Sequence, residues 1–219
     1  MPSEIQSQKY EKALHYEIFV KEEYWFAKNE ITKAWCIFDI GWHVGYFSLR
    51  CLALWTTAQI HYFEPVKDFY EQAKTNLIGC PNVILNNYGI WAKKEIWFMF
   101  LNEEKTMQSS KFHSFLNSST NKIEVRFGIL KNYIINNGIK KIDVLKLDVE
   151  GMEFEIFNSR SDFEWWKINN LIAEIHILDE EMLIRWNDIL PIIQKHFKHV
   201  KIIESWYRKE IFLIYAKKL

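Results

Sequence analysis

The chain has 219 residues, and its 28 basic and 28 acidic side chains cancel. It therefore lacks the overall positive charge that draws proteins to nucleic acid or anionic membranes, although a local basic patch remains possible. Three cysteines without C-x-x-C spacing argue against a disulfide framework and a structural zinc site. The sequence shows neither a signal-peptide pattern nor an apolar run of membrane-spanning length, which predicts a cytoplasmic protein without a membrane span. The length suits a single domain over residues 1–219, which could also be one module of a longer polypeptide.

The first predicted element is an amphipathic helix over Gln8–Lys28, within an N-terminal helical extension of residues 1–30. Leu14, Ile18 and Trp25 form an apolar stripe among Glu and Lys residues. Such a helix could cap the core of the domain or cover a ligand cleft.

The next stretch reads CIFDIGWHVGYFSL and changes from an apolar strand pattern to helical spacing. The change falls inside Asp39-x-Gly41-x-x-x-Gly45, which predicts a strand, a tight turn and a helix start. Glycines let the backbone take a positive φ and let a ligand approach closely, and the free N–H groups of a helix start suit polar or anionic groups. Asp39 could accept hydrogen bonds from a ligand. An ordinary strand–turn–helix corner would show the same pattern, so this stretch alone leaves both interpretations open.

A second apolar strand ends in FEP, which places Glu64 25 residues after Asp39. In nucleotide-binding βαβ units, an acid about 20 residues beyond the glycine turn binds the ribose hydroxyls. The dinucleotide fingerprint G-x-G-x-x-G is missing from this chain. Alone, Glu64 would most simply be a solvated acid at a strand end, but the turn and the acid together favour a cofactor site.

Strands and helices alternate along the chain, which predicts an α/β fold with a mostly parallel sheet. The predicted strands are Ala34–Ile40, Gln59–Glu64, Val83–Asn87, Ile142–Asp148, Leu171–His176, Val200–Glu204 and Ile211–Ala216, the last two paired and one of them antiparallel. The predicted helices are Val44–Trp55, Val66–Leu77, Ile129–Asn137, Phe154–Trp166 and Glu180–Phe197, the last interrupted near Pro191. Ile90–Leu101 predicts an added strand or hairpin. The polar residues 102–122 are the candidate substrate loop, because long loops in compact domains are commonly functional or disordered.

Four blocks of sequence follow one another between Trp35 and His176. They read FDIGWHVGYFSL, FEPV, IDVLKLDVEGMEF and LIAEIH. In this combination they resemble the FkbM family of methyltransferases. The resemblance implies a Rossmann-like class I methyltransferase fold, in which helices flank a mostly parallel seven-stranded sheet, and S-adenosyl-L-methionine as the cofactor.

The glycine turn, the strand-end polar residues and the resemblance together mark the residues expected to hold the cofactor. They are Asp39, Gly41, Trp42, His43, Gly45, Glu64, Asn87 and Asp148. Trp42 and His43 depart from the family pattern, which usually has Ala and Asn there. A third departure is Ile129–Asn132, which stands in place of a TLDD-like stretch and lacks its acid.

The ligands of open α/β sheets bind at the carboxyl ends of the strands, and this edge gathers a second polar group. The predicted catalytic residues are Asp148, Glu150, Glu174 and His176. Methyl transfer to a hydroxyl requires the oxygen to be held in line with the S–CH₃ bond, and a general base adds roughly 10²–10⁴-fold. His176 is the best base by its intrinsic pKa, so turnover would rise near pH 6 to 7. Asp148 could orient the hydroxyl or act as the base through a bound metal.

Asp148, Glu174 and His176 also have the ligand types of a Mg²⁺ or Mn²⁺ site. Their spacing does not require one, so a divalent metal is possible but not favoured. Lys146 faces the same side of its strand as Asp148, and a buried lysine needs a partner. We therefore expect a structural contact for Lys146 rather than a catalytic role.

For the acceptor, the resemblance implies a hydroxyl on a sugar, a glycan or a polyketide-like small molecule. Aromatic residues make up 16% of the chain, including 10 Trp, and together with the neutral charge they favour a carbohydrate groove over RNA. Methylation of RNA or of a protein amine is the alternative enzyme. A cofactor-binding module that has lost catalysis is the alternative outside enzymes, because the bulk of Trp42 could fill the cleft. Oligomeric state is not indicated by the sequence.

Overall fold

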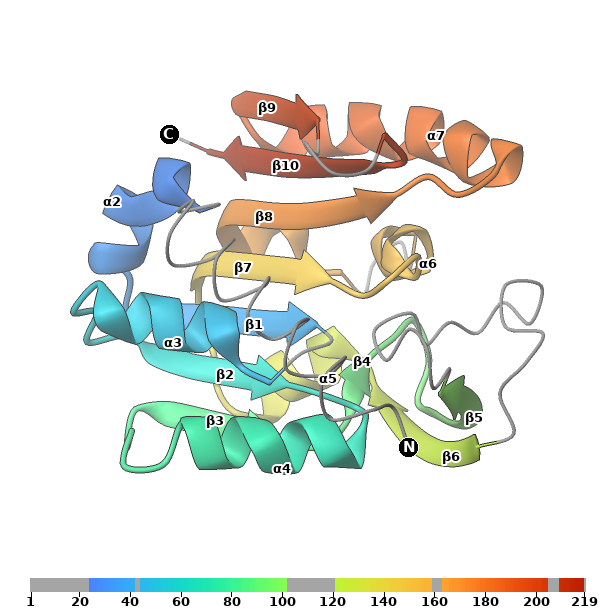
Figure 1. Cartoon of the computed structure of the whole chain (residues 1–219). Helices are drawn as coiled ribbons and strands as arrows, with labels where there is room; N and C mark the ends of the chain where they lie inside the picture. The colour runs from blue at the N-terminus through green and yellow to red at the C-terminus, as the bar shows by residue number, and fades with distance from the viewer. Residues whose placement is uncertain (1–23, 42–43, 102–120, 159–162, 205–208, 219) are drawn as a thin grey trace.

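The protein's structure is a computed structural model that describes residues 24–41, 44–101, 121–158, 163–204 and 209–218. Its centre is a seven-stranded sheet (Figure 1). Taken from one edge to the other, the strands are β3 (Val83–Asn86), β2 (Gln59–Phe63), β1 (Cys36–Gly41), β7 (Ile142–Asp148), β8 (Ile168–His176), β10 (Ile211–Lys217) and β9 (His199–Glu204). The first five are parallel, and β10 runs antiparallel to both β8 and β9. The predicted mostly parallel α/β fold is confirmed.

The two central strands are apolar on both faces, as strands covered by helices on each side must be. In the β1–β7 pair, Ile37 lies beside Val144 and Gly41 lies beside Asp148. Asp39 and Lys146, directly opposite each other in this pair, are polar exceptions in the middle of the strands. Since both are buried, each needs a partner inside the molecule.

Helices cover both faces of the sheet (Figure 1). On one face, α2 (Lys28–Thr32), α3 (Tyr46–Ala53) and α4 (Lys67–Asn76) pack over residues such as Val144 and Tyr62. On the other face, α5 (Leu130–Asn136), α6 (Glu153–Phe157) and α7 (Glu180–His196) join the larger core around Phe38 and Leu145. Two short 3₁₀ helices, η2 (Trp25–Ala27) and η5 (Trp165–Lys167), complete the described helices.

A second, three-stranded sheet lies beyond the carboxyl end of β2, in the order β4-β6-β5. Its strands are β4 (Gly89–Ile90), β5 (Glu95–Leu101) and β6 (Asn121–Gly128). Trp97 packs on Trp91 and Phe127, with ring centroids 4.7 and 4.6 Å apart. The predicted strand or hairpin over Ile90–Leu101 is therefore confirmed in part: β5 forms, but its partner is β6, which was not predicted. The first two residues of β6 belong to the stretch predicted as a loop, and the rest of that loop, residues 102–120, lies outside the described residues.

The predicted helix over Phe154–Trp166 is wrong in its length. The described residues of this stretch form only the short helix α6 and the 3₁₀ turn η5. Phe163 and Trp165 fold back onto Phe157, with ring centroids 5.0 and 5.3 Å away, and Glu164 between them takes a left-handed φ of 50°. Packing three aromatic rings together here requires a compact turn, which a continuous helix could not make.

Two further helix predictions need correction. Most of the helix predicted over Gln8–Lys28 lies outside the described residues, but Trp25–Ala27 is 3₁₀ and the α-helix α2 starts only at Lys28. Helix α7 continues through Pro191, where an interruption was predicted. Pro191 and Asn187 are both exposed, so the carbonyl that loses its proline N–H partner can be hydrated instead.

Within the described part of the chain, no helix combines the length and the apolar character that crossing a membrane would require.

Candidate active site

The turn after β1 is shaped by two glycines. A Cβ on Gly41 would overlap the backbone carbonyl oxygen of Asp148 and lie 2.6 Å from the Lys146 Nζ, so the ends of β1 and β7 can approach this closely only with glycine present. Gly45 precedes α3 with a left-handed φ of 84°, and a Cβ there would meet Leu77 at 3.0 Å. The strand that ends at Gly41 and the helix start after Gly45 confirm the two ends of the predicted turn. Trp42 and His43, the cofactor residues predicted within it, lie outside the described residues.

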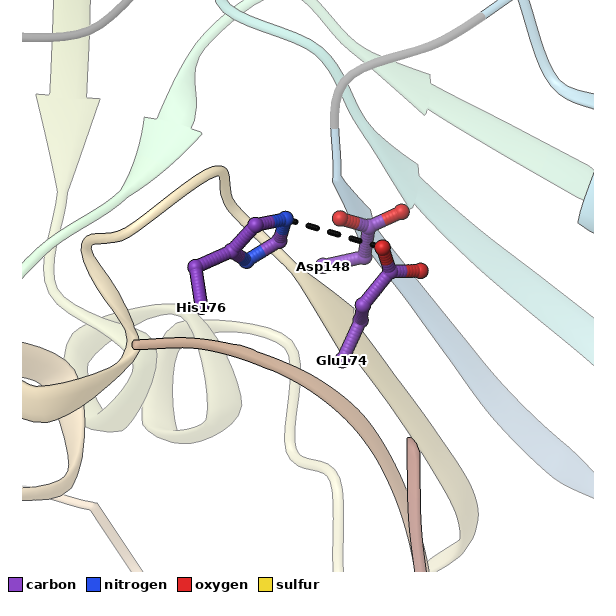
Figure 2. Close-up of side chains that lie close together, drawn as sticks. All are labelled: Asp148, Glu174 and His176. Atoms are coloured by element: carbon purple, nitrogen blue, oxygen red, sulfur yellow. Dashed lines mark ion pairs between the residues drawn. The ribbon is translucent and has the colours of Figure 1, made fainter. Parts of the chain in front are cut away.

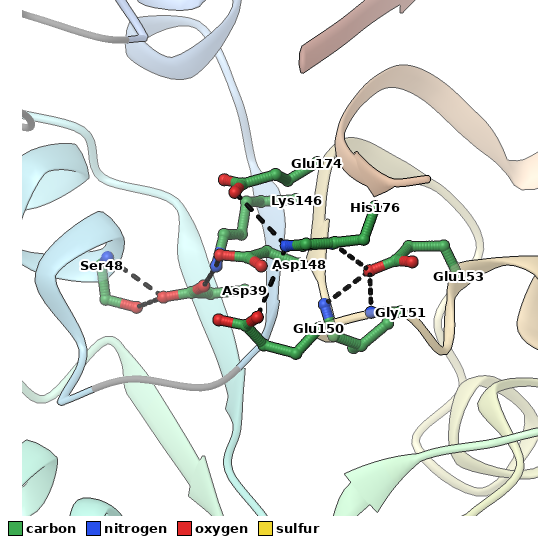
Figure 3. A network of polar contacts seen from close by, with 10 residues as sticks. Asp39, Ser48, Lys146, Asp148, Glu150, Gly151, Glu153, Glu174 and His176 are labelled. Atoms are coloured by element: carbon green, nitrogen blue, oxygen red, sulfur yellow. Dashed lines mark hydrogen bonds and ion pairs between the residues drawn. The ribbon is translucent and has the colours of Figure 1, made fainter. Parts of the chain in front are cut away.

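Asp39 ties the start of α3 to the sheet. Its Oδ2 accepts hydrogen bonds from the Ser48 N–H at 3.1 Å and from the Ser48 hydroxyl at 2.7 Å. Its Oδ1 lies 3.7 Å from the Lys146 Nζ, which in turn lies 3.3 Å from Asp148 (Figure 3). Burial alone would lower the pKa of Lys146, but Asp148 and Asp39 raise it above its usual value. The expected structural contact of Lys146 is confirmed, and it links the predicted cofactor acid to the predicted catalytic acid.

Glu64 and Asn87 follow the neighbouring strands β2 and β3. The Glu64 carboxylate is buried and accepts the Val66 N–H at 2.6 Å, while the Asn87 side chain donates to the Glu64 carbonyl at 3.0 Å. The Glu64 carboxylate therefore stabilises the turn that follows β2. Its binding to a ribose stays a prediction.

A small apolar pocket opens between these strand ends and the small sheet. Its lining includes Gly41, Phe63, Pro65, Ile90 and Met152. It lies between Gly41, at the end of β1, and Pro65, the residue after Glu64. The glycines and the acids Asp39 and Glu64 are the residue types expected around S-adenosylmethionine, and their binding to it stays a prediction.

The predicted catalytic residues gather at the ends of β7 and β8 (Figures 2 and 3). His176 Nε2 lies 3.5 Å from Glu174 Oε1 and 3.5 Å from Glu150 Oε2. Glu150 reaches this position because the turn after β7 is tight, with positive φ at both Glu150 and Gly151. The structure therefore brings Asp148, Glu150, Glu174 and His176 together, as the strand-end rule predicted.

Glu153, which the sequence reasoning missed, is the best-placed partner of His176. Its Oε1 lies 3.0 Å from the His176 Nδ1 and also accepts the N–H groups of Gly151 at 3.0 Å and Val149 at 3.3 Å. Its side chain is fully buried. The available signal was its place as the last acid of IDVLKLDVEGMEF, within the block that carries the family resemblance.

The charges around His176 hold its imidazole in the protonated form. Burial favours the neutral ring, but Glu153, followed by Glu150 and Glu174, raises the pKa of His176 well above its usual value. The surrounding carboxylates therefore favour the protonated ring over the neutral one. A base role for His176 would require a pH above the predicted range of 6 to 7.

The same cluster has the composition of a cation site. Ligand atoms of Asp148, Glu174 and His176 all lie within 4.8 Å of one another (Figure 2). Two carboxylate oxygens and an imidazole nitrogen suit Mg²⁺ or Mn²⁺. These are the three residues that the sequence marked as metal candidates.

The fold and this edge of polar residues define a class I methyltransferase. A profile of the methyltransferase FkbM domain matches residues 39–200, most of the chain. The chain belongs to the FkbM methyltransferase family and is an S-adenosylmethionine-dependent methyltransferase.

Solved structures share this fold at low sequence identity. A putative methyltransferase from Streptococcus mutans, solved in complex with S-adenosylhomocysteine, matches at 9% identity with a TM-score of 0.53, covering 89% of this chain and 96% of that one. A methyltransferase from Pyrococcus furiosus matches at 12% identity and a TM-score of 0.52, over 100% and 99%. A putative rRNA methylase from Clostridium thermocellum matches at 7% identity and a TM-score of 0.55, over 91% and 97%. At these identities the likeness concerns the fold alone. No curated protein matches the sequence.

Proposed function

We propose that this enzyme transfers the methyl group of S-adenosylmethionine to a hydroxyl oxygen of a sugar, a glycan or a similar small molecule. The single observation that carries the proposal is the cluster of Asp148, Glu150, Glu174 and His176 next to the glycine turn. Such a group can hold a neutral hydroxyl and remove its proton. The bound cofactor would supply an electrophilic methyl group on its sulfonium. A cytoplasmic location remains part of the proposal.

The side chains of the cluster differ in their exposure to solvent, and we assign their roles from this difference. The side chains of Asp148 and Glu150 are each 20% exposed, whereas that of His176 is 3% exposed. The two carboxylates are therefore placed to meet the acceptor and align its oxygen. His176 lies beneath them with its Nε2 toward the acceptor side and its Nδ1 on Glu153. Once neutral, it accepts the hydroxyl proton at Nε2, and Glu153 stabilises the imidazolium that results.

A divalent cation held by Asp148, Glu174 and His176 is the alternative way to activate the hydroxyl. The acceptor oxygen would then be acidified by the ion, and His176 would serve as a ligand rather than a base. Exhaustive chelation distinguishes the two. If turnover survives chelation unchanged, the metal route is excluded; if it stops and returns with Mg²⁺ or Mn²⁺, the direct base route is excluded.

The substrate class is tested by incubating the enzyme and labelled S-adenosylmethionine with a panel of glycosides, RNA and protein. We expect label on a glycoside hydroxyl, and we expect His176→Ala to reduce turnover by roughly 10²–10⁴-fold while leaving S-adenosylhomocysteine affinity nearly unchanged. Label on RNA or protein alone would reject the acceptor. No label on any acceptor, despite cofactor binding, would favour the cofactor-binding module without catalysis.

A further inference from the structure

The edge of the sheet opposite the active site carries a row of exposed apolar side chains. Each of the five parallel strands is preceded by a connection or helix end with one such residue, and these connections lie on the left in Figure 1. In sheet order they are Ile78 (82% exposed), Trp55 (90%), Trp35 (82%), Ile135 (62%) and Trp166 (67%). We call this row, with the lysines named below, the amino-terminal edge. Neighbouring strands lie about 4.8 Å apart, so the row extends over roughly 20 Å. Trp35, Trp55 and Trp166 therefore lie away from the acceptor site.

Trp55 is held in an unfavourable backbone conformation. It follows the end of α3 with φ 59°, where its N–H bonds the Leu52 carbonyl at 2.9 Å and the next N–H, of Thr56, reaches the Cys51 carbonyl at 3.5 Å. This is a Schellman ending, whose left-handed position is usually glycine or asparagine. A tryptophan here strains the backbone and leaves nearly all of its indole in water. The strained backbone and the exposed indole together indicate that Trp55 has a role at the surface.

Lysines lie along the part of this edge that runs from β1 to β9. The connections and strand ends at this edge contain seven: Lys33, Lys140, Lys141, Lys167, Lys198, Lys217 and Lys218. Among the described residues of these connections and strand ends, the acids are Glu164 and Asp143, and both are buried. Arg160 and Asp162, in the connection before β8, lie outside the described residues. Lys141 and Lys217 pair with Asp143 and Glu30 at 2.7 and 3.5 Å. The remaining cations give the edge a positive charge that the neutral total conceals.

We propose that the amino-terminal edge docks peripherally on an anionic lipid bilayer. Tryptophan side chains prefer the headgroup level of a membrane, and lysines are attracted to anionic lipids. Within the described residues, the cations of these connections and strand ends are all lysine. Protein interfaces instead favour arginine and are depleted of lysine, and planar recognition of nucleic-acid groups also favours arginine. The lysines complement the negative charge of anionic lipids, and the tryptophans suit the headgroup level. Together they favour a lipid surface as the partner of this edge.

Docking in this way sets the orientation of the enzyme. The strand β7 has seven residues, so the catalytic cluster at its carboxyl end would stand about 23 Å from the edge that meets the lipid. The active site would then face the water, open to an acceptor that approaches from solution.

The test is co-sedimentation of the full chain with vesicles. We expect binding to vesicles that contain phosphatidylglycerol, weaker binding to pure phosphatidylcholine, and loss of binding as salt rises. Trp35→Ser with Trp55→Asn should reduce binding to the anionic vesicles. Lys140→Gln with Lys198→Gln should reduce it about thirtyfold, from roughly fivefold for each lysine removed.

A matched control replaces exposed apolar residues elsewhere. Leu183→Ser with Ile184→Ser, on α7, should leave vesicle binding unchanged. Trp55→Asn alone should raise the melting temperature, since asparagine tolerates the left-handed conformation. Any loss of vesicle binding by this single variant therefore cannot come from unfolding. Absence of binding to anionic vesicles, or equal binding by wild type and the tryptophan variant, would overturn the proposal. Dimerisation or RNA binding that depends on these residues, without vesicle binding, would overturn it as well.

Discussion

His176 shows how neighbouring charges can change the chemistry of a single residue. Its intrinsic pKa makes histidine the natural base, yet Glu153, Glu150 and Glu174 stabilise its protonated form here. Glu153 has the strongest effect, because it is fully buried and hydrogen-bonded to the ring. The strength of the base, and the pH at which it acts, thus depend on a residue that does not face the acceptor.

Changing Glu153 should therefore move the pH dependence of catalysis. Glu153→Gln removes the charge but keeps the shape, so the pKa of His176 should fall. If neutral His176 is the base, the rise of turnover with pH should shift to lower pH by the same amount. Single-turnover rates across pH measure this. Glu155→Gln is the control, since Glu155 lies on the same helix but pairs with Arg185 at 2.9 Å. Identical profiles for wild type and Glu153→Gln would contradict the positioning role.

His61 is a second buried histidine, shifted in the opposite direction. It lies on β2 against Phe38, with ring centroids 4.8 Å apart, and its Nδ1 is 2.8 Å from the Tyr133 hydroxyl. Burial lowers its pKa to about 4. The unfolded chain therefore takes up a proton near pH 6.5, before the folded protein does.

Linkage then predicts a loss of stability in acid. The contribution of neutral His61 is fully present above pH 6.5 and is lost as pH falls toward 4, amounting to about 3 kcal/mol at the lower limit. In His61→Phe this dependence should disappear. Urea unfolding at about pH 7 and about pH 4.5 should show a smaller loss for the variant, by roughly 2 kcal/mol. Parallel losses in both proteins would mean that His61 does not set the acid sensitivity.

At the scale of elements, two strand acids join loops to the sheet at its opposite edges. Asp39 accepts from Ser48 and so positions α3 at the carboxyl edge. Asp143 accepts the N–H groups of Trp35 and Cys36, at 2.9 and 3.2 Å, and so positions the start of β1 at the other edge. The two residues have similar structural duties, but only Asp39 lies beside the predicted cofactor site.

This pair separates a structural effect from a binding effect. Asp39→Ala should lower the stability of the fold. It should also weaken S-adenosylhomocysteine binding by about 1.5–3 kcal/mol, which is the usual value of a hydrogen bond to a charged group. Asp143→Ala should lower stability in a similar way but leave the affinity nearly unchanged. Calorimetry with both variants decides the point. Equal affinities for the two would remove Asp39 from the cofactor site.

At the scale of the molecule, four acids gather around Lys146 at the carboxyl edge of the sheet, and lysines outnumber acids among the described residues of the opposite edge. The carboxyl edge holds Asp39, Asp148, Glu150 and Glu174, and the amino-terminal edge holds the lysine-rich connections. A formal charge of zero therefore describes the sum but not the distribution. The two edges should respond differently to salt, because exposed charges are screened more strongly than partly buried ones.

Salt should accordingly have little effect on turnover with a neutral acceptor and a large effect on vesicle binding. Between about 50 and about 300 mM salt, we expect less than a twofold change in kcat/KM and a several-fold loss of binding to anionic vesicles. Initial rates and co-sedimentation in the same buffers give both values. A steep fall in kcat/KM would instead indicate a charged acceptor such as nucleic acid.

Local pattern in the chain was enough to predict the mostly parallel sheet, the ends of the glycine turn and the gathering of Asp148, Glu150, Glu174 and His176. Periodicity reports which segments are strands, and parallel strands place their carboxyl ends on one edge, so these predictions needed no knowledge of packing. The strand Asn121–Gly128 was missed because its pairing with β5 joins segments across a long polar stretch.

Other properties arise only when distant segments pack together. The partnership of Glu153 with His176 and the resulting pKa depend on burial and on distances of a few ångströms between two elements, neither of which spacing along the chain reports. The row of exposed tryptophans and lysines likewise forms because five separate connections meet at one edge of the sheet. Whether a tryptophan packs in the core or faces water is decided by its neighbours in space, so composition alone could not place Trp35, Trp55 and Trp166 at the amino-terminal edge.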